Sequence, residues 1–397
     1  MGRTFWEAVM DEKRGLSTLC VHGGELKDVH GAPHTPLYDT TTFAFDSTAD
    51  LLDVVEGRKS GALYTRYGLN PTIQSLEAKL ALLEGAQSAL AFGSGMAATA
   101  ALFLAHGREG IVCVGDAYGG TLDLLEKQLP LLGIPTELLL TQEMGRLATL
   151  LGGSKKLVFF ETPTNPALEI IDIRHVASLA HDCGALVAVD NTFASPANQR
   201  PLAWGADIVV HSATKYLGGH SDLTAGALMG SEALLAPIRA WRSNFGQTIA
   251  AETAQLLARS LRTLVVRVER HNENAAAVAR ALRGHERVRT VFYPGLEGHP
   301  GHELARRQMQ GFGGMVTVDV RGDATDAAQV VDRLRLIKIA PSLGGVESLA
   351  TQPMTTTHHG LSATERARRG ITDTMIRLSI GLEDRDDLVS DLRQALG

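Results

Sequence analysis

Residues 185–215 read ALVAVDNTFASPANQRPLAWGADIVVHSATK, and this stretch decides the class of fold. Residues 185–189 and 208–210 are nearly continuous in Ala, Leu, Val and Ile, as expected for strands buried on both faces of a parallel sheet. The first run is followed by Asp190 and the second by residues 211–215, which end on Lys215. Ligands of open α/β sheets bind at the carboxyl ends of the strands. The stretch therefore predicts an α/β sheet whose edge carries an acid and an amine.

The same alternation of strands and helices extends towards the N-terminus. Short apolar runs at residues 88–92, 111–114 and 157–160 predict further buried strands, and residues 171–181 predict one of the helices between them. Another helix is expected from Pro71, because Asn70 suits the N-cap and Pro71 the first helical position; Gly85 would end it. Its core face would consist of Ile73, Leu76, Leu80 and Leu83. The pattern is that of a doubly wound α/β domain.

The texture of the sequence changes near residue 245. Residues 249–282 contain no helix breaker and predict one long connecting helix. Beyond it, apolar residues alternate with polar ones, which predicts strands with one buried face: Val316, Val318 and Val320, then Ile376, Leu378, Ile380 and Leu382. We therefore expect an N-terminal arm over residues 1–60, a large α/β domain over 61–250 and a smaller α+β domain over 251–397.

Composition excludes several classes of protein. The 397 residues carry 38 Lys and Arg against 44 Asp and Glu, a net charge of −6 with no basic block, which argues against nucleic-acid binding. No apolar stretch approaches the roughly 18 residues of a membrane span, and the N-terminus lacks the apolar core of a signal peptide. The three scattered cysteines predict free thiols in a reducing compartment, so we expect a cytoplasmic protein without a metal site.

Polar segments follow five of the predicted strands and would meet at one edge of the sheet. They are residues 93–96 (GSGM), 116–121 (DAYGGT), 161–166 (ETPTNP), 190 (D) and 211–215 (HSATK). Together they offer a carboxylate, an amine, an aromatic ring and a glycine-rich helix start. Pyridoxal 5′-phosphate (PLP) needs such a set: an acid for its ring nitrogen, an amine with a lowered pKa to bond it, and a helix N-terminus for its phosphate.

With these segments in view, the chain resembles the Cys/Met-metabolism (transsulfuration) group of fold-type I PLP enzymes over nearly its whole length. Such a resemblance implies a PLP-dependent transferase fold with a mainly parallel sheet in the large domain, here the PLP-binding domain, and a smaller α+β C-terminal domain. The matching segments are residues 64–66 with 70–72, 94–98, 116–121, 161–166, 189–192, 212–222, 262–264, 342–349 and 376–384.

The resemblance assigns the ring-binding residues. Lys215 would form the Schiff base with PLP and carry protons, Asp190 would pair with the pyridine nitrogen, and Asn165 would lie near the ring hydroxyl. Tyr118 would stack on the ring and act in acid–base chemistry.

The phosphate would be bound by residues from two subunits. Gly95 and Met96 would offer backbone N–H groups, with help from Ser212 and Thr214. Tyr64 and Arg66 resemble the pair that family members lend to a neighbouring subunit, which implies a homo-oligomer with shared sites, expected to be a homotetramer. The loop of residues 67–69 is one residue longer than in most relatives, and its effect on Arg66 is left open.

Substrate recognition is implied for four residues. Arg377, helped by Ser342, would bind the substrate carboxylate. Glu347 resembles the acid that meets the distal ammonium of cystathionine-like substrates, whereas the arm with Tyr38 resembles that of enzymes for shorter substrates. Methionine γ-lyases typically have a cysteine where this chain has Gly120.

The function implied is γ-elimination or γ-replacement on a small sulfur amino acid or homoserine ester, of the cystathionine γ-lyase or γ-synthase type. O-acetyl- or O-succinylhomoserine sulfhydrylase and methionine γ-lyase are the alternatives, and elimination and replacement are not separated. A nicotinamide-dependent oxidoreductase is a distant alternative, because Gly93 and Gly95 lack the third glycine of a dinucleotide fingerprint. His358 and His359 are interpreted as solvated loop residues.

Overall fold

Two β-sheets organise the chain in the computed structural model, which describes residues 14–152, 156–356 and 358–397. The larger sheet has the order β1-β7-β6-β5-β4-β2-β3. Its strands are β1 (Ser88–Phe92), β2 (Ile111–Val114), β3 (Thr136–Leu139), β4 (Leu157–Glu161), β5 (Leu186–Asp190), β6 (Ile208–Ser212) and β7 (Gly226–Gly230).

The middle of this sheet is parallel, as the apolar runs predict. Strands β3, β2, β4, β5 and β6 pair in parallel, whereas β7 pairs antiparallel with both β6 and β1. The strands β3 and β7 were not anticipated. In β3 only Leu139 is fully buried, and β7 reads GALMG, whose glycines weaken the sequence signal for a strand.

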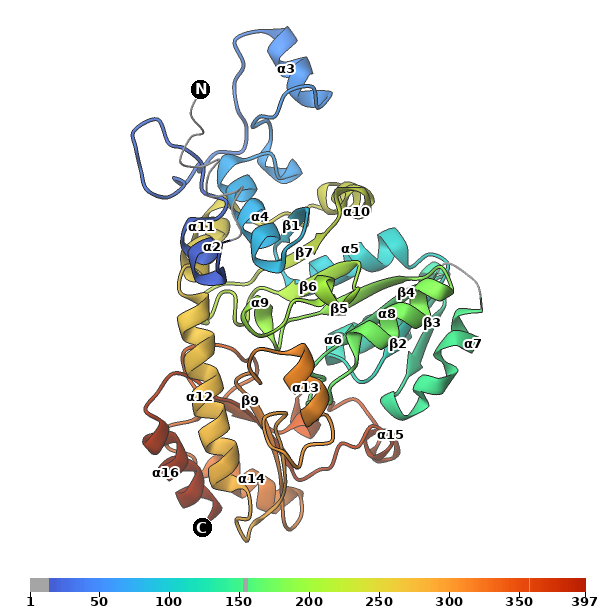
Figure 1. Ribbon diagram of the computed structural model, residues 1–397, viewed down its shortest axis with the longest axis vertical. Helices are drawn as coiled ribbons and strands as arrows, with labels where there is room; N and C mark the ends of the chain where they lie inside the picture. The colour runs from blue at the N-terminus through green and yellow to red at the C-terminus, as the bar shows by residue number, and fades with distance from the viewer. Residues whose placement is uncertain (1–13, 153–155, 357) are drawn as a thin grey trace.

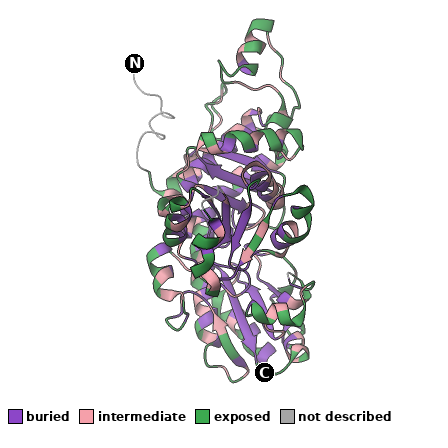
Figure 2. Ribbon diagram, turned by 90° about the vertical axis from the view of Figure 1, so that its right-hand side faces the viewer, coloured by how far each residue is buried: buried purple, intermediate pink, exposed green. Residues whose placement is uncertain are grey.

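Helices cover both faces of the large sheet (Figure 1). Along the chain, the helices that come after β1 and before β7 are α5 (Gly95–His106), α6 (Gly119–Asp123), α7 (Leu147–Leu151), α8 (Ile173–Asp182) and α9 (Ser195–Asn198). The same part of the chain contains the π-helical turn η2 (Leu124–Gln128) and the 3-10 turns η3 (Pro130–Leu132), η4 (Thr141–Arg146) and η5 (Pro201–Trp204). After β7 comes α10 (Glu232–Asn244). Because both faces are covered, the central strands β2, β4, β5 and β6 are buried on both sides (Figure 2).

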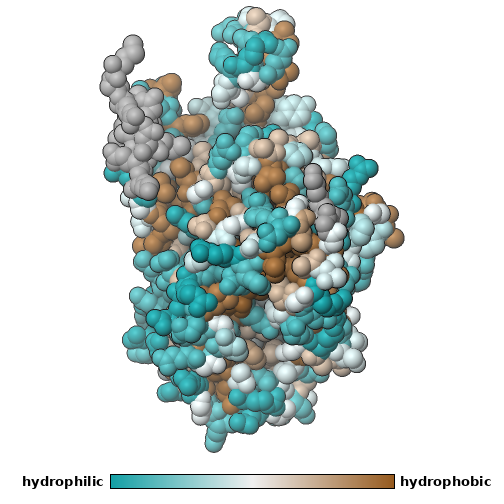
Figure 3. Space-filling view, turned by 45° about the vertical axis from the view of Figure 1, so that its right-hand side comes forward, coloured by the Kyte–Doolittle hydropathy of each residue, from teal (hydrophilic) through white to brown (hydrophobic). Residues whose placement is uncertain are grey.

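The expected first helix is present as α4 (Pro71–Glu84). The side chain of Asn70 accepts a hydrogen bond from Thr72 N at 2.9 Å, and Gly85 ends the helix with a φ of 71°. Before it, the segment expected as an extended arm contains α2 (Leu16–His22) and α3 (Thr48–Val55), and the turn η1 (Thr65–Tyr67) comes between this arm and α4. Figure 1 shows α3 projecting from the body, and on the face in Figure 3 this tip is largely hydrophilic. Residues 1–13 of the expected arm lie outside the described residues.

The long connecting helix is two helices, α11 (Ala251–Leu261) and α12 (Leu264–Leu282), so the prediction of one is wrong. The break lies at Arg262 and Thr263, where no Gly or Pro marks it. The guanidinium of Arg267 donates to Ser260 O at 3.0 Å and to Tyr216 O at 2.8 Å. A tertiary contact therefore satisfies the carbonyl at the end of α11, which sequence periodicity does not reveal.

The smaller sheet follows α12 and has the order β10-β11-β12-β9-β8. Its strands are β8 (Val288–Phe292), β9 (Met315–Val320), β10 (Lys338–Ile339), β11 (Leu349–Thr351) and β12 (Met375–Ser379). The helical segments of this region are α13 (His302–Gln308), α14 (Ala324–Asp332), η6 (Pro353–Thr355), α15 (Ala363–Arg368) and α16 (Arg385–Leu396). Long helix α12 runs beside both sheets (Figure 1).

The expectation of one buried face on β9 and β12 is incomplete, because every residue of both strands is buried. Val316 and Leu378 face the local core formed with α14 and α16. Thr317 turns to the half of the chain that forms the large sheet instead: its Oγ1 donates to Pro166 O at 2.7 Å. This second buried face brings Arg377 of β12 to the ends of the large-sheet strands.

Candidate functional site

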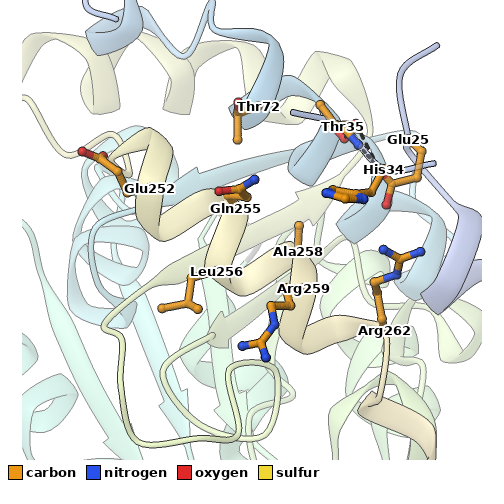
Figure 4. A pocket seen from close by; sticks show the side chains of 11 residues that line it. Glu25, His34, Thr35, Thr72, Glu252, Gln255, Leu256, Ala258, Arg259 and Arg262 are labelled. Carbon is orange, nitrogen blue, oxygen red and sulfur yellow. Dashed lines mark hydrogen bonds between the residues drawn. The ribbon is translucent and has the colours of Figure 1, made fainter. Parts of the chain in front are cut away.

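The cavities among the residues that the structure describes include two whose volumes suit a small molecule. One, of about 550 Å³, lies between the N-terminal segment, α4 and α11, and Figure 4 shows Arg259 and Arg262 beside it. Glu25 in its wall is neutralised by Lys79, whose Nζ lies 3.2 Å away. The lining contains no lysine, so it offers no amine for a carbonyl compound. The other cavity, of about 830 Å³, does contain one, and it lies at the carboxyl ends of the large-sheet strands.

This second cavity is where most of the predicted site residues meet. From the sequence prediction it contains Gly95, Met96, Tyr118, Asn165, Asp190, Ser212, Thr214, Lys215, Ser342 and Arg377. The lining comes from both halves of the chain, since Pro341 to Leu343, Thr356 and Arg377 follow α12 whereas the others precede it.

Lys215 lies just after β6, in the turn that begins at the end of the strand. Its Nζ donates to Ser342 Oγ at 2.6 Å. Burial, together with the positive charge of Arg377, lowers the pKa of Lys215 to about 8. An amine with this pKa has a neutral fraction of about one tenth at pH 7, compared with less than a thousandth for a free lysine. It can therefore act as a nucleophile and as a proton acceptor.

Two carboxyl groups lie next to each other in the wall of the cavity. Glu161 ends β4 and Asp190 ends β5, and the two residues are partners in the register of these parallel strands. Burial raises the pKa of both groups, and the proximity of Asp190 raises that of Glu161 further. Hydrogen bonds from Thr192 oppose the shift at Asp190, whose Oδ1 accepts Thr192 N at 2.8 Å. Such a buried acid is stabilised as a carboxylate by a cationic partner, such as a protonated ring nitrogen.

Another part of the lining suits an anion. Helix α5 begins at Gly95, and Ser94 caps it by accepting Ala97 N at 3.1 Å. The N–H groups of Gly95 and Met96 lie in the first turn, where no earlier turn supplies acceptors, and the helix dipole adds positive charge. A Cβ on Gly95 would lie 2.8 Å from Ser212 Cβ, so only glycine lets the helix start approach the end of β6 this closely.

Arg377 is held rigidly at the boundary of the two sheets. It is 4% exposed, and its two terminal nitrogens donate to Asn165 Oδ1 at 3.0 Å and to Ser342 O at 3.2 Å. Burial lowers the pKa of its guanidinium to about 10, so the group stays charged at neutral pH. A fixed planar cation of this kind is suited to bind a carboxylate with two hydrogen bonds.

Tyr118 lies in the short loop between β2 and α6. Its backbone N–H donates to Glu161 Oε1 at 2.7 Å, and its side chain is 48% exposed towards the cavity. Gly120 leaves room for the ring, because a Cβ there would lie 2.6 Å from Tyr118 Cε1.

Four predicted site residues are not part of this cavity lining. Tyr38 and Tyr64 are more than one third exposed. Arg66 lies against the ring of Tyr67 at 4.8 Å, and its Nη1 donates to Ser243 O at 2.6 Å. The carboxylate of Glu347 accepts the hydroxyl of Ser221.

The longer loop after Arg66 has a specific structure. Gly68 adopts a φ of 80° and packs on the guanidinium of Arg242, where a Cβ would overlap it. The buried Arg242 binds Tyr67 O and Glu77, so the extra residue is anchored to the body of the protein.

Sequence reasoning missed two contributors to the site. Glu161 stands at a strand end next to Asp190, which was a usable signal, but it was given no role. His358 is 1% exposed, and its Nε2 lies 3.1 Å from Asp116 Oδ2, so the interpretation of a solvated loop histidine is wrong. Only the tertiary structure brings His358 and Asp116 together.

An acid for a ring nitrogen, a lysine with a lowered pKa, and a helix N-terminus for a phosphate, all at one edge of a mainly parallel sheet, define a fold-type I PLP enzyme. The model of the Cys/Met metabolism PLP-dependent enzyme family matches residues 17–397. The chain therefore belongs to this family of PLP-dependent transsulfuration enzymes.

Several known proteins are similar to the chain over almost all of it. Cystathionine gamma-synthase 1, chloroplastic, of Nicotiana tabacum is 43% identical over 385 residues, which span 96% of this chain and 71% of the relative. L-methionine gamma-lyase of Fusobacterium nucleatum subsp. polymorphum is 38% identical over 390 residues, with 97% and 98% covered. The crystal structure of cystathionine gamma synthase from Xanthomonas oryzae pv. oryzae in complex with cystathionine superposes with a TM-score of 0.90 at 41% identity, covering 97% and 98%.

Proposed function

We propose that this enzyme catalyses γ-replacement: the thiol of cysteine displaces the activated γ-oxygen of a homoserine ester and gives cystathionine. The likeness to the Xanthomonas oryzae enzyme in complex with cystathionine, at a TM-score of 0.90, carries this choice of reaction. The 43% identity to the tobacco enzyme supports it. The cavity chemistry supports the shared first half of the reaction, which elimination would also use.

PLP fits the cavity by the chemistry of its donors. Lys215 offers the amine, Asp190 an acid that needs a cationic partner, and Gly95 a helix start that no side chain fills. When bound, PLP supplies an electron sink for the charge left on the α-carbon of an amino acid.

The protein residues bind and orient the substrate and move its protons. Arg377 would hold the α-carboxylate through a bidentate contact, and its hydrogen bonds to Asn165 Oδ1 and Ser342 O keep the guanidinium plane fixed. Lys215 Nζ, partly neutral at pH 7, would take the proton from the α-carbon. Once it had given that proton up again, the neutral amine would take a second proton from the β-carbon, and the electron pair left on that carbon would expel the γ-substituent with its bonding electrons. Ser342 Oγ would orient this amine between the two positions. Tyr118 would cover the ring.

Sharing of sites between subunits is part of the proposal. Among the described lining residues, the part of the cavity formed by Ser94 to Met96, Ser212 and Thr214 contains no Lys or Arg to neutralise a phosphate. Arg66, which lies outside this chain's own cavity, would supply that charge to a neighbour, and Tyr64 would add a hydrogen bond from its hydroxyl. We propose a homotetramer built from such dimers.

Substrate length would be recognised outside the ring-binding residues. Glu347, on the same loop as Ser342, would exchange its contact with Ser221 for the distal ammonium of cystathionine. Tyr38, on the arm, would contact the substrate from its outer side. We divide the chain into an arm (1–60), a PLP-binding domain (61–250) and a C-terminal domain (251–397).

A cytoplasmic location is also proposed. The three cysteines are free, and two of them, Cys20 and Cys113, are buried. Burial raises the pKa of both thiols, which makes them inert. Within the described residues, no helix is long and apolar enough to cross a membrane.

Elimination is the second candidate, because a methionine γ-lyase is 38% identical over the same length. A product assay separates the two. Purified enzyme loaded with PLP is given O-acetyl- or O-succinylhomoserine with cysteine, and separately cystathionine or methionine alone. Cystathionine formed from the ester and cysteine is the expected result. Release of 2-oxo acid and ammonia from methionine as the dominant activity would overturn the proposal. A preference for sulfide over cysteine as the nucleophile would overturn it as well.

A further inference from the structure

The position of Tyr118 is set by its backbone rather than by its ring. The residue is 48% exposed, so few side-chain contacts hold it. Its N–H is fixed by Glu161 at 2.7 Å. Behind it α6 begins, and Thr121 N and Leu122 N donate to Tyr118 O at 2.9 and 3.0 Å, so it is the residues before Tyr118 that need a further contact to fix them.

That contact is made by Asp116, two residues before Tyr118, in a buried group that we call the Asp116 cluster (Asp116, His358 and Arg369). Asp116 Oδ2 lies 3.1 Å from His358 Nε2, and Oδ1 accepts Arg369 Nη1 at 3.1 Å. The side chains of Asp116, His358 and Arg369 are 8%, 0% and 2% exposed. Asp116 Oδ1 also accepts the N–H of Ala117 at 3.1 Å, which ties the carboxylate to the loop itself.

Arg369 binds residues that come before and after Tyr118 in the sequence. Besides Asp116, it reaches Glu126 of η2 with Nη2 at 3.1 Å and Glu365 of α15 with Nε at 2.9 Å. Each arm of its planar guanidinium therefore has a carboxylate partner, a geometry that fixes orientation. Residues before and after Tyr118 are thus joined to the segment that contains α15.

This segment runs from η6 to β12, and β12 carries Arg377, which lines the same cavity. The Asp116 cluster therefore connects two parts of the site that are far apart in the sequence. A buried ion pair adds little net stability compared with an apolar contact of the same shape, so its presence here favours a role in geometry.

We propose that Asp116, His358 and Arg369 are positioning residues for the reaction: they hold Tyr118 over the cofactor at a fixed place relative to Arg377. The inference rests on the proposed role of Tyr118 at the ring, and it applies to elimination and replacement alike. A displacement of about 1 Å is enough to cost two orders of magnitude in rate.

The chain offers a matched control in Arg368. It neighbours Arg369 and also joins α15 to the large-sheet half, through Glu143 at 3.2 Å, but its side chain is 45% exposed. An exposed pair of this kind contributes little. Arg368→Met should therefore behave as the unsubstituted protein in every measurement below.

The test compares Arg369→Met with Arg368→Met in three ways. In protein freed of PLP, hydrogen–deuterium exchange of residues 116–124 should quicken in Arg369→Met alone. In protein loaded with equal amounts of PLP, the visible circular dichroism of the cofactor should weaken in the same variant. With substrate, kcat should fall by about ten- to a hundredfold with a smaller change in KM.

A second background shows whether the effect passes through Tyr118. Introduced into Tyr118→Phe, Arg369→Met should cost much less than it does alone. If Arg369→Met does not fold, His358→Gln and His358→Ala replace it, and the glutamine, which keeps an N–H donor for Asp116, should preserve more activity than the alanine.

The inference is overturned by unchanged exchange and kinetics in Arg369→Met, by equal losses in both backgrounds, or by equal behaviour of the two His358 variants. The proposed role of Tyr118 fails in a different way: Tyr118→Phe and Tyr118→Ala would then leave the cofactor signal and kcat unchanged. The two failures are therefore distinguishable.

Discussion

Lys215 and Ser342 are joined by a 2.6 Å hydrogen bond between Nζ and Oγ, although they belong to opposite halves of the chain. Ser342 adopts a φ of 96°, a conformation that L-residues rarely take and that persists where surrounding structure enforces it. The backbone strain thus lies at the residue that accepts the hydrogen bond of the buried amine.

Lys215 should be the only lysine joined to the cofactor, because burial and Arg377 give it a neutral fraction at neutral pH. Reduction of the loaded protein with borohydride, followed by peptide mass mapping, should find the phosphopyridoxyl label on Lys215. Label on another lysine would refute the central assignment.

The stability of the PLP-free protein should depend on pH through Lys215. Its pKa is lowered from 10.5 to about 8 on folding, so the unfolded chain binds more protons between these values and stability rises with pH across that window. Lys215→Met removes this dependence. The variant should melt at a higher temperature than the unsubstituted protein at pH 7, and the difference should shrink as the pH rises from 8 towards 10.5. A difference that is constant with pH would contradict the lowered pKa.

Gly120→Cys should displace Tyr118, because a Cβ at this position would lie 2.6 Å from the ring. We expect a changed circular dichroism of bound PLP and a fall in kcat of about tenfold or more. Gly145→Ala is the control, since no atom lies within 4 Å of a Cβ there. Unaltered spectra and rates in Gly120→Cys would mean that the ring moves at no cost.

Two inactive variants should restore activity when mixed, if Arg66 serves a neighbouring subunit. Arg66→Ala and Lys215→Ala would be unfolded together and refolded with PLP. Half of the random dimers are hybrids with one intact site, so about a quarter of the original activity is expected. Sedimentation that finds a fully active monomer would exclude shared sites.

Glu347→Ala and Arg377→Ala should differ in substrate dependence. If Glu347 binds a distal ammonium, Glu347→Ala should lower kcat/KM for cystathionine by the equivalent of about 1–3 kcal/mol. The same variant should leave kcat/KM for homoserine esters and methionine unchanged, because these substrates lack that group. Arg377→Ala should reduce kcat/KM for every amino-acid substrate, since all carry the α-carboxylate. An equal effect of Glu347→Ala on all substrates would make the residue structural.

The strand ends were predictable because their signals are local. The end of an apolar run predicts where a strand ends, and the residues that follow it, such as Asp190 or Lys215, predict which side chains lie at that edge of the sheet. The family resemblance placed Arg377, and the structure brings it to the same cavity as Lys215.

The parts that could not be predicted depend on long-range contacts. The break between α11 and α12 is set by Arg267 reaching Ser260 O and Tyr216 O, and no residue type at the break itself marks it. His358 is drawn into the interior by Asp116, which lies 242 positions away in the sequence. A local pattern cannot contain such a partner, so His358 resembled a loop residue.

Strands β9 and β12 are buried on both faces, which bears on whether the two halves of the chain can fold separately. Part of their polar face is satisfied by the other half of the chain, through Thr317 with Pro166 O and Arg377 with Asn165. Residues 251–397 expressed alone would expose these groups, so we expect the fragment to be unstable. For the same reason, a chimaera that joins the C-terminal half of one relative to the N-terminal half of another would have to inherit both sides of this interface together. The half that carries Arg377 and the half that carries Lys215 are expected to evolve as one unit.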